Sequence, residues 1–149
     1  MKIKILNKHN LSYANEIANL HVKNINGKLS NIGFEFLLKI YQSFLVNKNI
    51  RIWILVYDKK LIGFLCGCGD NKKIYLKFLT ENFFSLIFLF LKNILNFSFL
   101  RNIYGLIILF LFSDKSPSIN SELLSITISK KFRNKSYGRK LIKKLDIYL

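Results

Sequence analysis

The residues best suited to chemistry lie near the end of the sequence, where an apolar run meets a basic connection. Residues 122–129 (ELLSITIS) predict a strand, residues 130–135 predict a basic turn, and a helix is predicted from Ser136. The first N–H groups of a helix lack partners within it, and the helix dipole adds to their preference for a negative charge. This order of elements predicts an anion site, such as a seat for a phosphate.

The residue types of the turn strengthen that prediction. Arg133, Lys135 and Arg139 add positive charge, and Gly138 allows a ligand to approach the backbone closely. Taken alone, the same residues favour an ordinary capped and solvated turn over an anion site. Deciding between these two interpretations requires the longer sequence pattern that contains these residues.

The segment from Phe132 to Leu141, following the strand, resembles the central motif of the GNAT N-acetyltransferases. In that family the pattern [Gln/Arg]-x-x-Gly-x-[Gly/Ala] follows a strand, opens a helix and cradles the pyrophosphate of acetyl-CoA. Arg133 and Gly138 match the pattern. Ser136 stands where the first glycine is usual, and Asn134 stands where a glycine often follows the arginine.

The resemblance implies an acetyl-CoA-dependent N-acetyltransferase that acts on a primary amine of a small molecule or a protein. Acetyl-CoA is then the co-substrate, with the strand backbone holding the pantetheine arm and the turn holding the pyrophosphate. The implied cofactor-binding residues are Ile126, Thr127, Ile128, Arg133, Asn134, Lys135, Ser136, Tyr137, Gly138 and Arg139.

Glu122, at the start of the same strand, occupies a position where some family members place the general base. A surface glutamate at a strand entrance is the equal alternative. Family members usually continue beyond this helix with further strands, which carry a tyrosine that acts as an acid on the leaving thiolate. This chain stops at Leu149, so we assign no such acid and expect the C-terminal strands to be missing. A truncated, inactive acyl-CoA-binding remnant, or a module associated with a membrane or partner, is the competing function.

The elements that must position these residues follow from the periodicity of the rest of the chain. Lys2 to Leu6 predicts a strand, and two helices are predicted to follow, the second from Asn31. Residues 50–57 and 61–69 predict a hairpin whose two faces are both covered. Together they predict one α/β (α+β) domain over residues 1–149, with a mixed, mostly antiparallel sheet flanked by helices.

An apolar insertion at about residues 72–113 separates the hairpin from the last strand. Its core, Phe83 to Phe112, is interrupted by Lys92 and Arg101 into stretches shorter than the roughly 18 residues that a membrane span needs. We therefore predict a largely helical insertion. Its apolar residues are too many for one buried face, which leaves docking on a membrane surface or in a homo-oligomer open.

The composition restricts the remaining function classes. The net charge is +16, from 24 Lys and Arg against 8 Asp and Glu, but only four of the basic residues are arginine and none alternates with aromatics as in a base-stacking surface. We expect no nucleic-acid partner. We also expect no metal, since His21 fits a packed histidine. Cys66 and Cys68 suit a reducing compartment, and the N-terminus lacks a signal-peptide pattern, so the predicted location is cytoplasmic.

Overall fold

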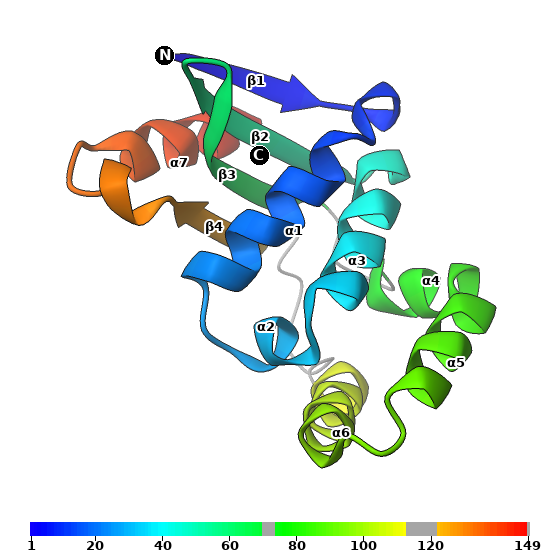
Figure 1. Ribbon diagram of the computed structural model, residues 1–149. Helices are drawn as coiled ribbons and strands as arrows, with labels where there is room; N and C mark the ends of the chain where they lie inside the picture. Colours follow the sequence, from blue (N-terminus) through cyan, green and yellow to red (C-terminus); the bar gives the residue numbers. More distant parts are fainter. Residues whose placement is uncertain (70–73, 113–121, 149) are drawn as a thin grey trace.

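The computed structural model describes residues 1–69, 74–112 and 122–148, and Figure 1 shows a sheet with helices on both of its faces. The elements are β1 (Lys2–Leu6), η1 (Lys8–Asn10), α1 (Tyr13–Asn24), α2 (Lys28–Ile32), α3 (Phe34–Val46), β2 (Ile50–Tyr57), β3 (Lys60–Cys68), α4 (Ile74–Glu81), α5 (Phe83–Lys92), α6 (Phe97–Phe112), β4 (Glu122–Ile128), η2 (Lys130–Phe132) and α7 (Tyr137–Tyr148).

The four strands form one sheet in the order β1-β2-β3-β4, and each neighbouring pair is antiparallel. The β2–β3 turn consists of Asp58 and Lys59, both with positive φ, as the two-residue turn of a twisted hairpin requires. Among the described strands β4 pairs with β3 alone, so its other edge is free. The predicted mostly antiparallel sheet flanked by helices is confirmed.

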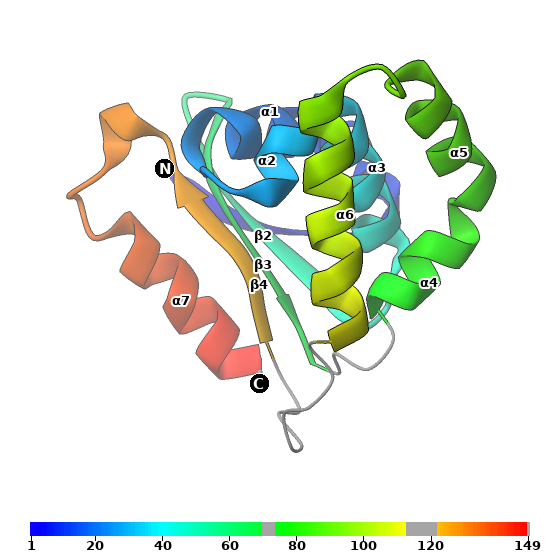
Figure 2. The ribbon, with the colours of Figure 1, turned by 90° about the horizontal axis from the view of Figure 1, so that it is seen from below.

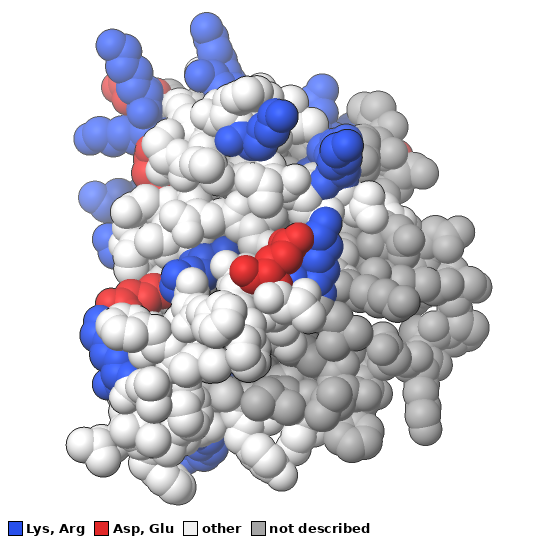
Figure 3. Space-filling model, turned by 90° about the vertical axis from the view of Figure 1, so that its right-hand side faces the viewer, with Lys and Arg blue, Asp and Glu red and all other residues white. Residues whose placement is uncertain are grey.

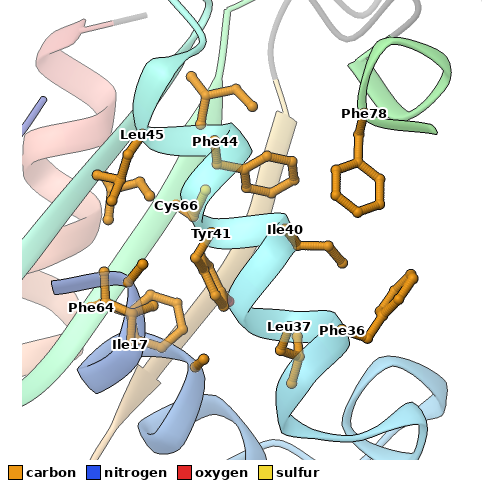
Figure 4. Packing of buried hydrophobic residues seen from close by; sticks show 14 of the residues in the cluster. Ile17, Phe36, Leu37, Ile40, Tyr41, Phe44, Leu45, Phe64, Cys66 and Phe78 are labelled. Atoms are coloured by element: carbon orange, nitrogen blue, oxygen red, sulfur yellow. The ribbon is translucent and has the colours of Figure 1, made fainter. Parts of the chain in front are cut away.

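Both faces of the sheet are covered, which explains why β2 and β3 are apolar throughout instead of alternating. α1 and α3 pack on one face, and α7 packs on the other (Figure 2). In the larger core Tyr41 of α3 meets Phe64 of β3 edge to face, with 5.4 Å between ring centroids (Figure 4). On the opposite face Leu141 and Leu145 of α7 contact a smaller cluster around Trp53.

The helix predicted from Asn31 is in fact two helices. Gly33, with φ +112°, ends α2 and precedes α3. Residues with a side chain rarely adopt such a φ, so this glycine allows the chain to turn between the two helices. The break lets α2 pack against α6 while α3 packs against the sheet.

The insertion contains three helices, α4, α5 and α6, within residues 74–112; residues 72, 73 and 113 lie outside the described residues. α4 joins the main core through Phe78, whose ring meets Phe36 of α3 edge to face at 5.8 Å between centroids. No helix in the described part of the chain combines the length and apolarity needed to cross a bilayer.

The apolar spacing from Ser136 predicts one buried helix face formed by residues 137, 141, 142, 145, 148 and 149, with the basic residues 139, 140, 143 and 144 pointing away from it. Residue 149 lies outside the described residues. For Ile142 the prediction is wrong. Leu141 and Leu145 are buried, but Ile142, expected on the same face, is 41% exposed. Successive helical residues are about 100° apart, so residues 137, 141 and 145 form one stripe that Ile142 does not join. The basic residues of the helix, at positions 139, 140, 143 and 144, are exposed as predicted.

Candidate functional site

A cavity of about 670 Å³ opens where β4, the turn after it and the end of α1 meet. Its volume lies within the range of about 300–1,000 Å³ that is usual for small-molecule sites. The lining residues are Asn24, Ile25, Asn26, Ile126, Thr127, Ile128, Phe132, Arg133, Asn134, Ser136, Tyr137 and Gly138.

The structure therefore brings together eight of the ten residues implied as cofactor-binding. Lys135 and Arg139 are exposed and do not line the cavity, because the left-handed turn and the first turn of α7 direct them elsewhere. Sequence reasoning missed the opposite wall, Asn24 to Asn26. The sole sequence signal there, Asn26 before Gly27, marks a helix end and carries no information about β4.

The start of α7 presents unpaired N–H groups at this cavity. The chain leaves β4 through η2, where the Phe132 N–H donates to Ser129 O at 2.8 Å. The first helical bond runs from the Lys140 N–H to Ser136 O at 3.1 Å. Within the described residues, no acceptor is found for the N–H groups of Tyr137 and Gly138, and the first turn has no acidic residue. This helix end therefore favours an anion.

The turn before α7 places two residues in the left-handed region, Asn134 at φ 61° and Ser136 at φ 56°. These are the two positions where the family pattern has or often has glycine. The tight turn is thus formed without glycine, at the conformational cost of about 1–2 kcal/mol that a left-handed residue with a Cβ incurs. Asn tolerates this region better than Ser does.

We expect Ser136→Gly to leave the free energy of unfolding unchanged or to raise it by up to about 1 kcal/mol, because relief of the left-handed strain outweighs the added freedom of the unfolded chain. Lys135→Gly is the matched control: Lys135 is outside the positive-φ set, so the same change should lower that free energy by about 0.5–1 kcal/mol. Urea denaturation measures both. A lower value for Ser136→Gly than for Lys135→Gly would contradict the conformation of the turn.

The free edge of β4 supplies further backbone groups. The Ser129 N–H donates to Ile62 O of β3 at 2.7 Å, and groups along an antiparallel strand point alternately to either side. The backbone N–H and C=O groups of Thr127 therefore point toward β3, whereas those of Ile126 and Ile128 point to the free edge beside the cavity. Of the three residues implied to pair with the pantetheine arm, these two can do so through their backbone.

Arg133 crosses the mouth of the cavity. Its Nε donates to Ile128 O at 3.1 Å, and its Nη2 donates to Asn24 O at 3.4 Å. The side chain thus joins the end of β4 to the end of α1. A guanidinium has five N–H donors, and two of them find acceptors among the described residues, which leaves three available to a ligand.

No protein-family model matches the sequence, and no curated protein matches it significantly. Among solved structures, the ribosomal-protein-alanine N-acetyltransferase from Brucella melitensis biovar Abortus 2308 matches with a TM-score of 0.51 and 12% identity, over 99% of this chain and 69% of that one. The chain has a GNAT-like fold. At this identity the likeness concerns the fold alone.

Within this GNAT-like fold, Glu122 lies apart from the cavity. It is half-buried at the start of β4, opposite Cys68 of β3, and it is not among the lining residues. Ile126 lies four positions further along the strand, a distance of about 13 Å. Its role as a base stays a prediction. In the described part of the chain no three His, Cys, Asp or Glu side chains cluster as a metal site would need.

A buried polar chain links α1 and α3 to β4 inside the GNAT-like fold. His21 Nδ1 and the Tyr41 hydroxyl are 2.6 Å apart, and that hydroxyl is 3.2 Å from Ser125 Oγ. Burial lowers the pKa of His21 from 6.5 to about 4, so the ring is neutral at pH 7. These hydrogen bonds hold the middle of β4 in place, next to the residues that line the cavity.

Proposed function

We propose that the chain binds acetyl-CoA in the cavity at the end of β4 and transfers its acetyl group to a primary amine. The carrying observation is that two sets of backbone donors face one cavity: the first N–H groups of α7 and those on the free edge of β4 at Ile126 and Ile128. The GNAT-like fold and the Arg133 to Gly138 pattern support the same proposal.

The residues present fit the chemistry of that co-substrate. A diphosphate needs N–H donors and positive charge, which the start of α7 and Arg133 offer; an amide-containing arm needs an unpaired strand edge, which β4 offers. Acetyl-CoA, when bound, supplies an acetyl group activated as a thioester. The chain's own part is to hold the two ends of this molecule and align it for attack by an amine.

Arg133→Ala should weaken acetyl-CoA binding about 10- to 100-fold, the equivalent of about 1.5–3 kcal/mol for a charged hydrogen bond. Isothermal titration calorimetry of the purified chain measures this change. Lys131→Ala is the control, because it removes the same charge from an exposed side chain that does not line the cavity. Absence of binding heat in the unaltered chain, or equal losses in the two variants, would contradict the proposed site.

A binding module without catalysis is the second candidate function. The position of Glu122, outside the cavity lining, favours it, because it separates the one proposed base from the proposed acyl donor site. Release of free CoA thiol in the presence of primary amines distinguishes the two candidates. Binding without amine-dependent thiol release supports the module, and turnover excludes it.

A further inference from the structure

Exposed apolar side chains gather on α5, α6 and the turn between them. We call this set the α5–α6 apolar surface: Phe84, Phe88, Leu91, Leu95, Phe97 and Tyr104, which are 59–98% exposed. Leu95 in the turn is 98% exposed and Phe84 is 84% exposed. Large apolar side chains that are exposed in such number on two neighbouring helices commonly mark a contact surface.

The exposed apolar side chains of α5 lie on a different face of the helix from the one that packs into the core. Phe84, Phe88 and Leu91 recur at four- and three-residue spacing on one face of the helix. The opposite face is already used: Leu89 is buried in the main core, and it lines an apolar groove of about 360 Å³ together with Phe36 of α3. α5 is therefore apolar on both faces, which an amphipathic surface helix is not.

The charge around this surface indicates what covers it. Residues 82–112 contain no Asp or Glu, and the chain as a whole carries +16. Arg101 lies on the exposed face of α6, four residues after Phe97 and three before Tyr104, and no carboxylate of the described residues pairs with it. Figure 3 shows this side of the molecule with mostly uncharged side chains over the described part of its lower half, and with Lys and Arg side chains and a smaller number of Asp and Glu above and beside it. Lys92 of α5 is paired with Glu35 of α3 at 2.7 Å, so Arg101 is the cation of α5 and α6 that has no carboxylate partner among the described residues.

A second copy of the chain is a poor partner for such a surface, because it would bring a further +16 to the contact. A surface of anionic headgroups over an acyl layer complements both the apolar residues and the positive charge. α5 and α6 have 10 and 16 residues, and no described helix can cross a bilayer, so they would lie within the interface.

We propose that the α5–α6 apolar surface docks on an anionic phospholipid bilayer. Phe84, Leu95 and Phe97 enter the boundary between headgroups and acyl chains, and Arg101 stays at headgroup level. The turn between β4 and α7 lies on the other side of the molecule, so docking leaves the cavity open (Figure 1). The proposal does not depend on what the cavity binds.

Sedimentation with phospholipid vesicles tests the proposal on the whole chain. We expect at least tenfold more binding to vesicles of phosphatidylglycerol and phosphatidylcholine than to phosphatidylcholine alone, with a steep loss at 0.5 M salt. The triple variant Phe84→Ser, Phe88→Ser, Phe97→Ser should lose at least tenfold. Val46→Ser with Ile142→Ser is the control, because these exposed apolar residues lie outside the surface.

Leu95→Trp gives a second readout that does not depend on how well the triple variant folds. The natural Trp53 is buried, so a blue shift of the added fluorescence with anionic vesicles reports insertion at position 95. No shift, or equal vesicle binding by a folded triple variant, overturns the proposal. A dimer seen by analytical ultracentrifugation that these substitutions abolish, without vesicle binding by the unaltered chain, also overturns it in favour of a second copy.

Discussion

Leu141→Ala should lower the free energy of unfolding by about 3 kcal/mol, within the range of about 2–5 kcal/mol found for buried leucines. Leu141 has no exposed surface and lies between α7 and the sheet, in a cluster with Leu65 and Ile128. This cluster holds α7 to the sheet, and it is small, so few neighbours can move to fill the lost volume. Urea denaturation of the purified chain measures the change.

Ile142→Ala is the matched control, since it removes a similar side chain one position further along the same helix. Ile142 is 41% exposed, and its truncation should cost less than about 1 kcal/mol. Because α7 begins at the cavity, Leu141→Ala should also weaken acetyl-CoA binding more than Ile142→Ala does. Equal losses of stability in the two variants would contradict the packing of α7 against β3 and β4.

Close packing beside Gly67 supports the ranking of these two positions. A Cβ at Gly67 would lie 2.5 Å from Leu145 Cδ1, so the absence of a side chain there lets α7 approach β3. A glycine inside an apolar strand indicates either a weaker strand or a place where another part of the protein approaches the backbone closely, but it does not identify that part. The sequence therefore indicates that something packs closely against Gly67, and only the fold shows that it is Leu145 of α7.

Local signals predicted the part of the site that is local in sequence. The apolar run, the basic turn and Gly138 place β4, the turn and α7 in succession, and eight of the ten residues taken from that pattern line the cavity. Such a prediction succeeds because a short turn leaves the helix little choice of position relative to the strand. Thr127 lines the cavity, but its backbone cannot pair with a ligand there as predicted, because its N–H and C=O groups point toward β3. Which groups point that way is decided by the register with β3, a partner that is distant in sequence.

Features that depend on distant contacts were not predictable. Asn24 to Asn26 reach the cavity only because α1 packs across the sheet, and Arg133 meets Asn24 O across 109 residues of sequence. The apolar insertion shows the same limit. Its composition predicts helices and an excess of apolar residues, but which of them stay exposed is decided by the packing of Leu89 and Phe78 into the core.

His21 was predicted to be a packed, hydrogen-bonded histidine, and this is confirmed. Its ring is 3% exposed, stacks 6.3 Å from Phe64 and shares a hydrogen bond with Tyr41. Among the described residues no carboxylate stabilises a charged ring, so burial is the dominant effect and lowers the pKa of His21 to about 4.

Acidification should therefore destabilise the protein through His21. Above about pH 6.5 the ring is neutral in both the folded and the unfolded chain, so it has no effect on stability; as the pH falls from 6.5 to about 4, only the unfolded chain takes up the proton. The free energy of unfolding should fall over this window by at most about 3 kcal/mol, at 1.36 kcal/mol for each unit of pKa difference.

The variant His21→Asn separates this effect from the titration of carboxylates. The amide can reach Tyr41 from the place of Nδ1 but has no proton to gain, so the variant starts less stable and should have a shallower slope between pH 6.5 and 4. Urea denaturation across that range measures both slopes. Parallel curves would show that the proton on His21 is no more costly in the folded chain than in the unfolded one. A shallower variant curve would establish that the Tyr41–His21 pair, and with it the anchoring of Ser125 on β4, depends on a neutral imidazole.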